Sequence, residues 1–143
     1  MNIHIKRFDK ELPLPRHQTD GAAAFDFTVR GDMTIAPHAV GYVPLNVAIG
    51  TPPGSVLLLA ARSSLHKKGL MLVNGIGVGD PDFSGDSDEY FAALLNFTDK
   101  SVEIKRGDRL VQGMFISLLK FEWKEVESMH GEKRGGFGTT GSK

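Results

Sequence analysis

The sequence lacks cysteine, a net charge and any long apolar run. Without cysteine, the chain can form no disulfide and no thiolate metal site. Its 17 acidic and 17 basic side chains balance, which argues against a dedicated nucleic-acid binder, because such proteins usually carry a basic excess. The longest apolar run, Val56–Ala61, is too short to cross a bilayer, and the N-terminus lacks the apolar core of a signal peptide. We therefore expect a soluble, cytoplasmic protein with no membrane and no nucleic-acid partner.

The sequence also lacks a sustained helical stripe of apolar residues. Its 143 residues suffice for one domain with a substantial core. The predicted strands are the alternating segments Val43–Ile49 and Leu119–Lys124, the short segment Val102–Ile104, and the apolar runs Val56–Ala61 and Phe91–Phe97. A buried helix is the alternative for the two apolar runs. The one helix candidate is Ser63–Lys68, ended by Gly69. Short strands separated by many turns predict an all-β sandwich or barrel.

The final segment, residues 130–143, differs in composition from the rest of the chain. It is rich in glycine, threonine, lysine and arginine, and its one apolar residue is Phe137. Such a segment buries too little surface to order itself, so we predict a β domain at 1–129 and a flexible glycine-rich arm at 130–143. The arm's G-x-G-x-x-G pattern lacks the strand and helix of a dinucleotide fingerprint. Its backbone N–H groups and Arg134 suit the binding of phosphates; a tail without a role is the alternative.

The run Val73–Gly85, VNGIGVGDPDFSG, is the most informative in the sequence. Its glycines suit a backbone that approaches a ligand closely, with a carboxylate held beside it. It resembles the start of a calcium-binding EF-hand loop, but Phe91 stands where that loop requires glutamate. Carboxylates two positions apart on a strand face opposite ways, so one of Asp80 and Asp82 would point into a site and the other away. An acidic turn without a function is the alternative.

A second candidate site is Ala61–Leu65, ARSSL, which follows an apolar run and opens the helix candidate. Backbone N–H groups, two serine hydroxyls and the Arg62 guanidinium would together bind an anion. The alternative is an ordinary serine cap beside a surface arginine.

In order along the chain, five segments resemble the motifs of the trimeric dUTP diphosphatases, or dUTPases. They are Ala22–Phe27, Ala61–Leu65, Asn74–Gly85, Gly107–Gly113 and Arg134–Gly141. The resemblance implies an all-β, jelly-roll-like sandwich (the dUTPase-like β-clip) with at most a short helical turn. It also implies a homotrimer with shared active sites, hydrolysis of dUTP to dUMP and pyrophosphate, and Mg2+ as cofactor. Such an enzyme limits uracil in DNA and supplies dUMP for thymidylate synthesis.

The resemblance assigns a role to each matching residue. Asp80 matches the catalytic carboxylate that activates water for attack on the α-phosphate, which leaves Asp82 as the carboxylate expected to face away and shape the turn. Asp26 matches a carboxylate near the metal site, in contact through water. The other positions match substrate contacts: Asn74, Val78, Gly79 and Phe91 for uracil, Phe83 for deoxyribose, Arg62, Ser63, Ser64, Gln112 and Arg134 for the phosphates, and Phe137 stacked over the base as the arm closes.

Two departures from the family pattern stand out. Gly79 replaces the isoleucine or similar residue that usually precedes the catalytic aspartate. Asp86–Glu89 lengthens the following turn by about three residues. The related dCTP deaminases carry an essential glutamate where this chain has Ser84, so deamination is the weaker alternative. A catalytically silent nucleotide-binding protein of the same fold is the other.

Overall fold

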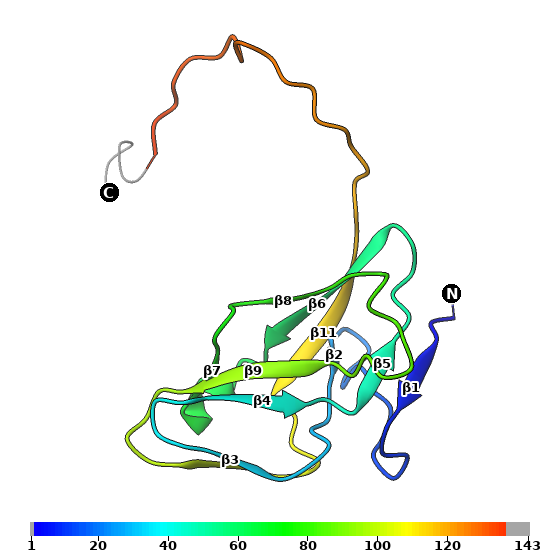
Figure 1. Cartoon of the computed structure of the whole chain (residues 1–143), viewed down its shortest axis with the longest axis vertical. Coiled ribbons are helices and arrows are strands. Elements are labelled where there is room, and N and C mark those ends of the chain that lie inside the picture. The colour runs from blue at the N-terminus through cyan, green and yellow to red at the C-terminus, as the bar shows by residue number, and fades with distance from the viewer. Residues whose placement is uncertain (1, 137–143) are drawn as a thin grey trace.

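The computed structural model describes residues 2–136, and they form an antiparallel β-sandwich (Figure 1). The strands are β1 (Ile5–Arg7), β2 (Phe25–Asp26), β3 (Met33–Ile35), β4 (Val40–Pro44), β5 (Val47–Ile49), β6 (Ser55–Ala61), β7 (Leu70–Leu72), β8 (Gly77–Gly79), β9 (Phe91–Asn96), β10 (Val102–Ile104) and β11 (Val111–Ser117). The two larger sheets have the orders β2–β11–β6–β8 and β4–β9–β7, and β1–β5 and β10–β3 form separate pairs. The predicted all-β fold is confirmed.

Both larger sheets contribute to one hydrophobic core. Its fully buried side chains include Val43 and Leu94 from the three-stranded sheet, and Leu57 and Val111 from the four-stranded sheet. Burying a large apolar side chain contributes about 1.5–3 kcal/mol, so the inward-facing residues of these short strands hold the sandwich together. The predicted strands at 56–61, 91–97 and 102–104 are confirmed as β6, β9 and β10.

The alternating segment Val43–Ile49 is two strands rather than the single predicted strand. Its four alternating residues, Val43, Leu45, Val47 and Ile49, are all buried, as the pattern predicts. Asn46 interrupts the chain with a φ of 69°, in the left-handed region. The Asn46 side chain exchanges hydrogen bonds of 2.7 and 3.0 Å with the backbone of Asp9. This turn sends β4 and β5 into different sheets.

The predicted helix is present but short. It is a 3-10 turn, η1 (Leu65–Lys68), and Gly69 ends it with a φ of 77°. Ser64 stands at the N-cap position without a capping hydrogen bond from its side chain. Within residues 2–136, no helix has the length and apolar character needed to cross a membrane.

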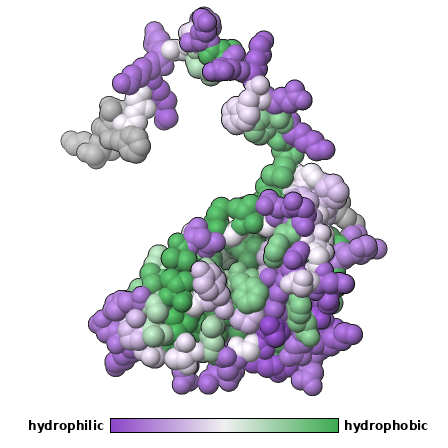
Figure 2. Space-filling model, viewed as in Figure 1, coloured by the Kyte–Doolittle hydropathy of each residue, from purple (hydrophilic) through white to green (hydrophobic). Residues whose placement is uncertain are grey.

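The predicted strand at Leu119–Lys124 is wrong for the chain as described. After β11 ends at Ser117, residues 118–136 form no strand and run away from the sandwich (Figure 1). The alternating side chains Leu119, Phe121 and Trp123 are 85%, 63% and 90% exposed. Apolar groups gather where this segment leaves the body, and hydrophilic ones follow (Figure 2). Periodicity shows that a segment can be a half-buried strand, but a neighbouring strand must be present to pair with it.

Candidate active site

Arg62, a predicted phosphate ligand, is held by the carboxylate of Asp26. The Arg62 Nε atom lies 3.0 Å from Asp26 Oδ1, and Arg109 Nη1 lies 3.2 Å from Asp26 Oδ2. Asp26 is only 6% exposed, so its charge is compensated by two guanidiniums rather than by water. Sequence reasoning left Arg109 without a catalytic role, and its contact with Asp26 shows that it helps to fix this cluster.

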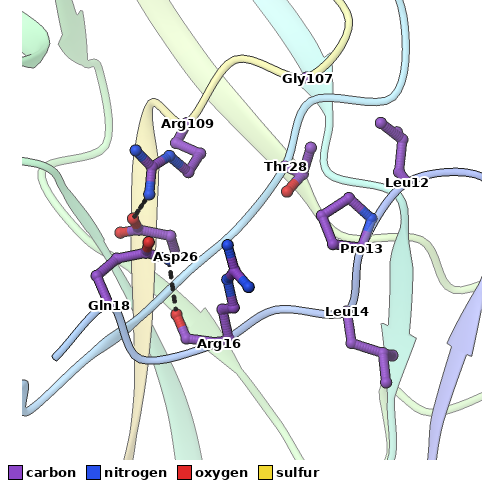
Figure 3. A pocket seen from close by; sticks show the side chains of 9 residues that line it. All are labelled: Leu12, Pro13, Leu14, Arg16, Gln18, Asp26, Thr28, Gly107 and Arg109. Carbon is purple, nitrogen blue, oxygen red and sulfur yellow. Dashed lines mark hydrogen bonds and ion pairs between the residues drawn. The ribbon is translucent and has the colours of Figure 1, made fainter. Parts of the chain in front are cut away.

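Asp26 also borders a cavity whose wall is formed largely by the chain segment that precedes β2. The cavity has a volume of about 300 Å3, and Leu12, Arg16, Thr28 and Arg109 are among its lining residues (Figure 3). The backbone N–H of Asp26 donates to the Arg16 carbonyl at 3.1 Å, which attaches the segment before β2 to the sandwich.

Gln112 lies beside the arginine cluster because of strand register. In β11 it pairs with Asp26 of β2 on one side and with Ala60 of β6 on the other. Its Nε2 donates a 3.0 Å hydrogen bond to the Ala61 carbonyl. The structure therefore brings together predicted residues from three distant segments of the sequence.

Ser63 and Ser64 follow directly after Arg62 and are exposed. A cavity of about 380 Å3 opens beside them, lined by Arg62, Ser63 and Gly75 among others. Arg62 and Ser63, at the turn that opens η1, therefore border a space large enough for phosphate groups. The binding of an anion by this segment stays a prediction.

A second group of predicted residues lies along and after the turn that connects β7 to β8, two strands that belong to different sheets. Asn74, Val78, Phe83 and Phe91 line one cavity of about 310 Å3. Gly79 is buried beneath it, and the Tyr90 ring forms part of its wall. Sequence reasoning missed Tyr90; the absence of a side chain at position 79 was the signal that a bulky neighbour could be found there.

Asp80 and Arg62 belong to opposite ends of β6. Gly79, next to Asp80, pairs with Leu57, whereas Arg62 comes immediately after the other end of the strand. The strand between Leu57 and Arg62 spans roughly 17 Å. Asp80 and Asp82 are both exposed, so within one chain the predicted base does not reach the phosphate cluster.

Two predicted residues lie on the C-terminal segment. Arg134 is exposed, on the part that runs away from the sandwich. Phe137 lies outside the described residues.

No resident metal site is visible among residues 2–136, where no three His, Asp or Glu side chains cluster suitably. Both carboxylate oxygens of Asp26 contact arginines, and the positive charges of these arginines disfavour a cation bound directly beside them. The water-mediated contact with Mg2+ stays a prediction.

Comparison with known proteins agrees with the geometry. The dUTPase family model matches residues 10–142. The chain is 35% identical over 148 residues to the deoxyuridine 5'-triphosphate nucleotidohydrolase of Dictyoglomus turgidum, with 99% of each chain covered. The dUTPase structure from Streptococcus mutans has a TM-score of 0.75 at 33% identity, covering 83% of this chain and 98% of that one. The dUTPase of Staphylococcus bacteriophage 80alpha, solved with dUPNHPP, has a TM-score of 0.84 over 99% of both chains, and at 20% identity it shares the fold. By the family match and the identity to full-length relatives, the chain belongs to the dUTPase family.

Proposed function

We propose that this chain hydrolyses dUTP to dUMP and pyrophosphate, in active sites shared between the subunits of a homotrimer. A water oxygen bonds to the α-phosphorus while the bond from that phosphorus to the bridging oxygen of the pyrophosphate breaks. Asp80 accepts the proton of the water as general base. The observation that carries the proposal is the cavity lined by Asn74, Val78 and Phe83, which ends at the strand leading directly into Asp80.

The edge strand β8 is suited to recognising a nucleobase through its backbone. In the order of the described strands, β8 lies at the edge of its sheet, so the backbone groups on its outer side can bind an extended edge of a ligand. Val78 and Gly79 then pair with uracil, and the Asn74 amide adds a donor and an acceptor. A strand backbone this close to the base leaves no room for the methyl group of thymine.

The cluster of Arg62, Ser63, Ser64 and Gln112 binds the phosphates. Charge-assisted hydrogen bonds from Arg62 stabilise the negative charge that develops on the phosphates during the reaction. Arg134 and Phe137 of the C-terminal arm close over the nucleotide, and this closure excludes water from the site.

The distance between the two groups supports the proposal that sites are shared between subunits. A general base must lie within hydrogen-bonding reach of its water, yet roughly 17 Å of β6 separates the Asp80 end from the Arg62 end. A second copy of the chain, presenting its Arg62 to this Asp80, completes the site. The exposed apolar residues of β7 and of the turn that follows it, Met71, Val73 and Ile76, are typical of a surface that another subunit covers.

Mg2+ enters as part of the nucleotide complex. Such an ion retains several waters and is bound largely through phosphate oxygens, which agrees with a chain whose described residues contain no carboxylate cluster. We place the reaction in the cytoplasm, and that location stays a prediction.

A nucleotide panel tests the proposal. Purified protein with Mg2+ is expected to release pyrophosphate from dUTP and not from dTTP, dCTP or UTP. Bound dUTP without release would identify a silent nucleotide-binding protein, and ammonia from dCTP would identify a deaminase.

A further inference from the structure

Gly79 lies directly against the ring of Tyr90. A Cβ atom built on Gly79 would overlap the Tyr90 Oη and lie 2.8 and 2.9 Å from two ring carbons. These distances are far below ordinary van der Waals contact. The tyrosine ring therefore occupies the space into which any side chain at position 79 would extend.

The Tyr90 ring has little freedom to move away. It is 5% exposed and packs against Phe27 at 6.4 Å and Phe83 at 5.1 Å between ring centroids. Its backbone is fixed as well, since Tyr90 N–H donates to Val47 and the Tyr90 carbonyl accepts from Leu45, both at 2.9 Å. The edge-to-face contact with Phe83 is a favoured aromatic geometry.

The hydroxyl of Tyr90 does not hold the ring in place. Neither it nor the buried hydroxyl of Thr51 has a hydrogen-bond partner among the described residues. Burial raises the pKa of Tyr90 above its ordinary value, so the phenol is neutral near pH 7. Its ring, rather than acid–base chemistry, is what Tyr90 brings to the cavity.

Phe83 connects this packing to the nucleotide. Its ring is 38% exposed, and it lines the same cavity as Asn74 and Val78. The Phe83 ring is therefore accessible to a ligand, while the Tyr90 ring that it contacts is fixed in the core. A shift of Tyr90 would change the depth of the cavity at the position where Phe83 meets the sugar.

We propose that Tyr90 is a positioning residue that takes the place of the missing side chain at Gly79 and, by fixing Phe83, sets the selectivity for deoxyribose over ribose. The inference rests on the proposed function, because it assumes that the cavity takes the nucleoside part of dUTP. Gly79 and Tyr90 act as one unit, because the Tyr90 ring fills the space that a side chain at position 79 would occupy.

A double-variant cycle tests this unit. The measured quantity is the ratio of kcat/KM for dUTP to kcat/KM for UTP. Tyr90→Val, which leaves Phe83 unsupported, is expected to lower the ratio about tenfold, mainly through KM. Gly79→Ile, which collides with the ring, is expected to lower it by a similar factor. In the double variant, the isoleucine introduced at position 79 fills the space vacated by Tyr90→Val, and the ratio is expected to return to within about twofold of the wild type.

Two conservative variants separate the ring from its hydroxyl. Tyr90→Phe retains the ring and is expected to preserve the ratio, and Thr51→Val removes the facing hydroxyl with the same expectation. If Tyr90→Val does not fold, Tyr90→Leu is measured in its place, since it retains more volume. An unchanged ratio in the folded aliphatic variant, or a double variant whose loss is the product of the two single losses, would overturn the proposal.

Binding separates this inference from the proposed function. Calorimetric affinities for dUMP and UMP report sugar selectivity without any turnover. A wild-type chain that binds dUMP but does not hydrolyse dUTP would contradict the proposed function, and the same variant pattern in affinities would still support or overturn the role of Tyr90.

Discussion

The carboxylate of Asp26 lies 3.0 Å from the guanidinium of Arg62, so a residue of the first motif positions a residue of the second. This contact is possible because β2 and β6 both pair with β11, which places their residues on either side of one strand. Asp26 consequently stabilises the phosphate cluster before any nucleotide or metal binds.

Replacement of Asp26 by asparagine should weaken both folding and nucleotide binding. The change leaves Arg62 and Arg109 without a carboxylate, and we expect the free energy of unfolding to fall by about 1–2 kcal/mol. KM for dUTP should rise, because Arg62 loses its orientation. Chemical denaturation and steady-state kinetics measure the two effects. The control is Asp99→Asn, which removes a highly exposed pair with His38; an equal loss in this control would refute a special role for Asp26.

Replacement of Asp80 by asparagine should abolish turnover and preserve binding. Loss of a general base typically reduces kcat by about 10²–10⁴-fold, whereas the affinity for the dUTP–Mg2+ complex should change little. Single-turnover kinetics and calorimetry measure these quantities. Asp82→Asn is the matched control, since Asp82 is expected to face away. Undiminished turnover in Asp80→Asn would remove Asp80 from the role of base.

The exposed apolar residues Phe121 and Trp123 should contribute to subunit assembly. In the isolated chain they are exposed, and large aromatics at a subunit contact each contribute about 2 kcal/mol or more. Replacing both by serine should therefore shift the protein toward smaller species on dilution, as measured by sedimentation velocity. Lys120→Ser with Lys124→Ser, which changes two charged side chains of the same segment and leaves both aromatics in place, should leave assembly unchanged. Aromatic variants that remain fully assembled at the same dilution would count against this contact.

Removal of residues 135–143 should reduce turnover strongly while the oligomer persists. The predicted arm closes over the nucleotide, and without it water enters the site. Sedimentation and dUTP turnover of the truncated protein provide the two measurements. A truncated protein of full activity would contradict the closing role of the arm.

Stability should depend on pH through Asp9. A hydrogen bond from Arg106 first, and one from the Glu11 N–H second, hold the pKa of Asp9 below its ordinary value. A depressed folded pKa means that the stabilisation is present above the unfolded pKa of about 3.9 and is lost as pH falls through the folded value. Asp9→Asn should therefore be less stable than wild type at pH 7, with the difference disappearing in strong acid. Denaturation at several pH values measures this trend, and a constant difference would exclude Asp9 as its source.

The sequence was sufficient for the fold class, and it named candidate residues whose roles stay predictions. Apolar runs and turn residues predict β6, β9 and β10, because the preference for burial acts locally along a strand. The left-handed turn at Asn46 could not be predicted from the sequence, because it depends on hydrogen bonds to Asp9, 37 positions away. The strand β11 was not predicted either, because its apolar residues alternate only in part.

The sequence by itself determined that this is an all-β chain carrying, in order, the residues of the dUTPase motifs. The tertiary structure decided which of them meet. It joined Asp26 to Arg62, placed Tyr90 beneath Gly79, and separated Asp80 from the phosphate cluster along β6. The reason is physical: motif residues are specified by local chemistry, whereas their contacts depend on strand register and on the volume of neighbours that are distant in sequence.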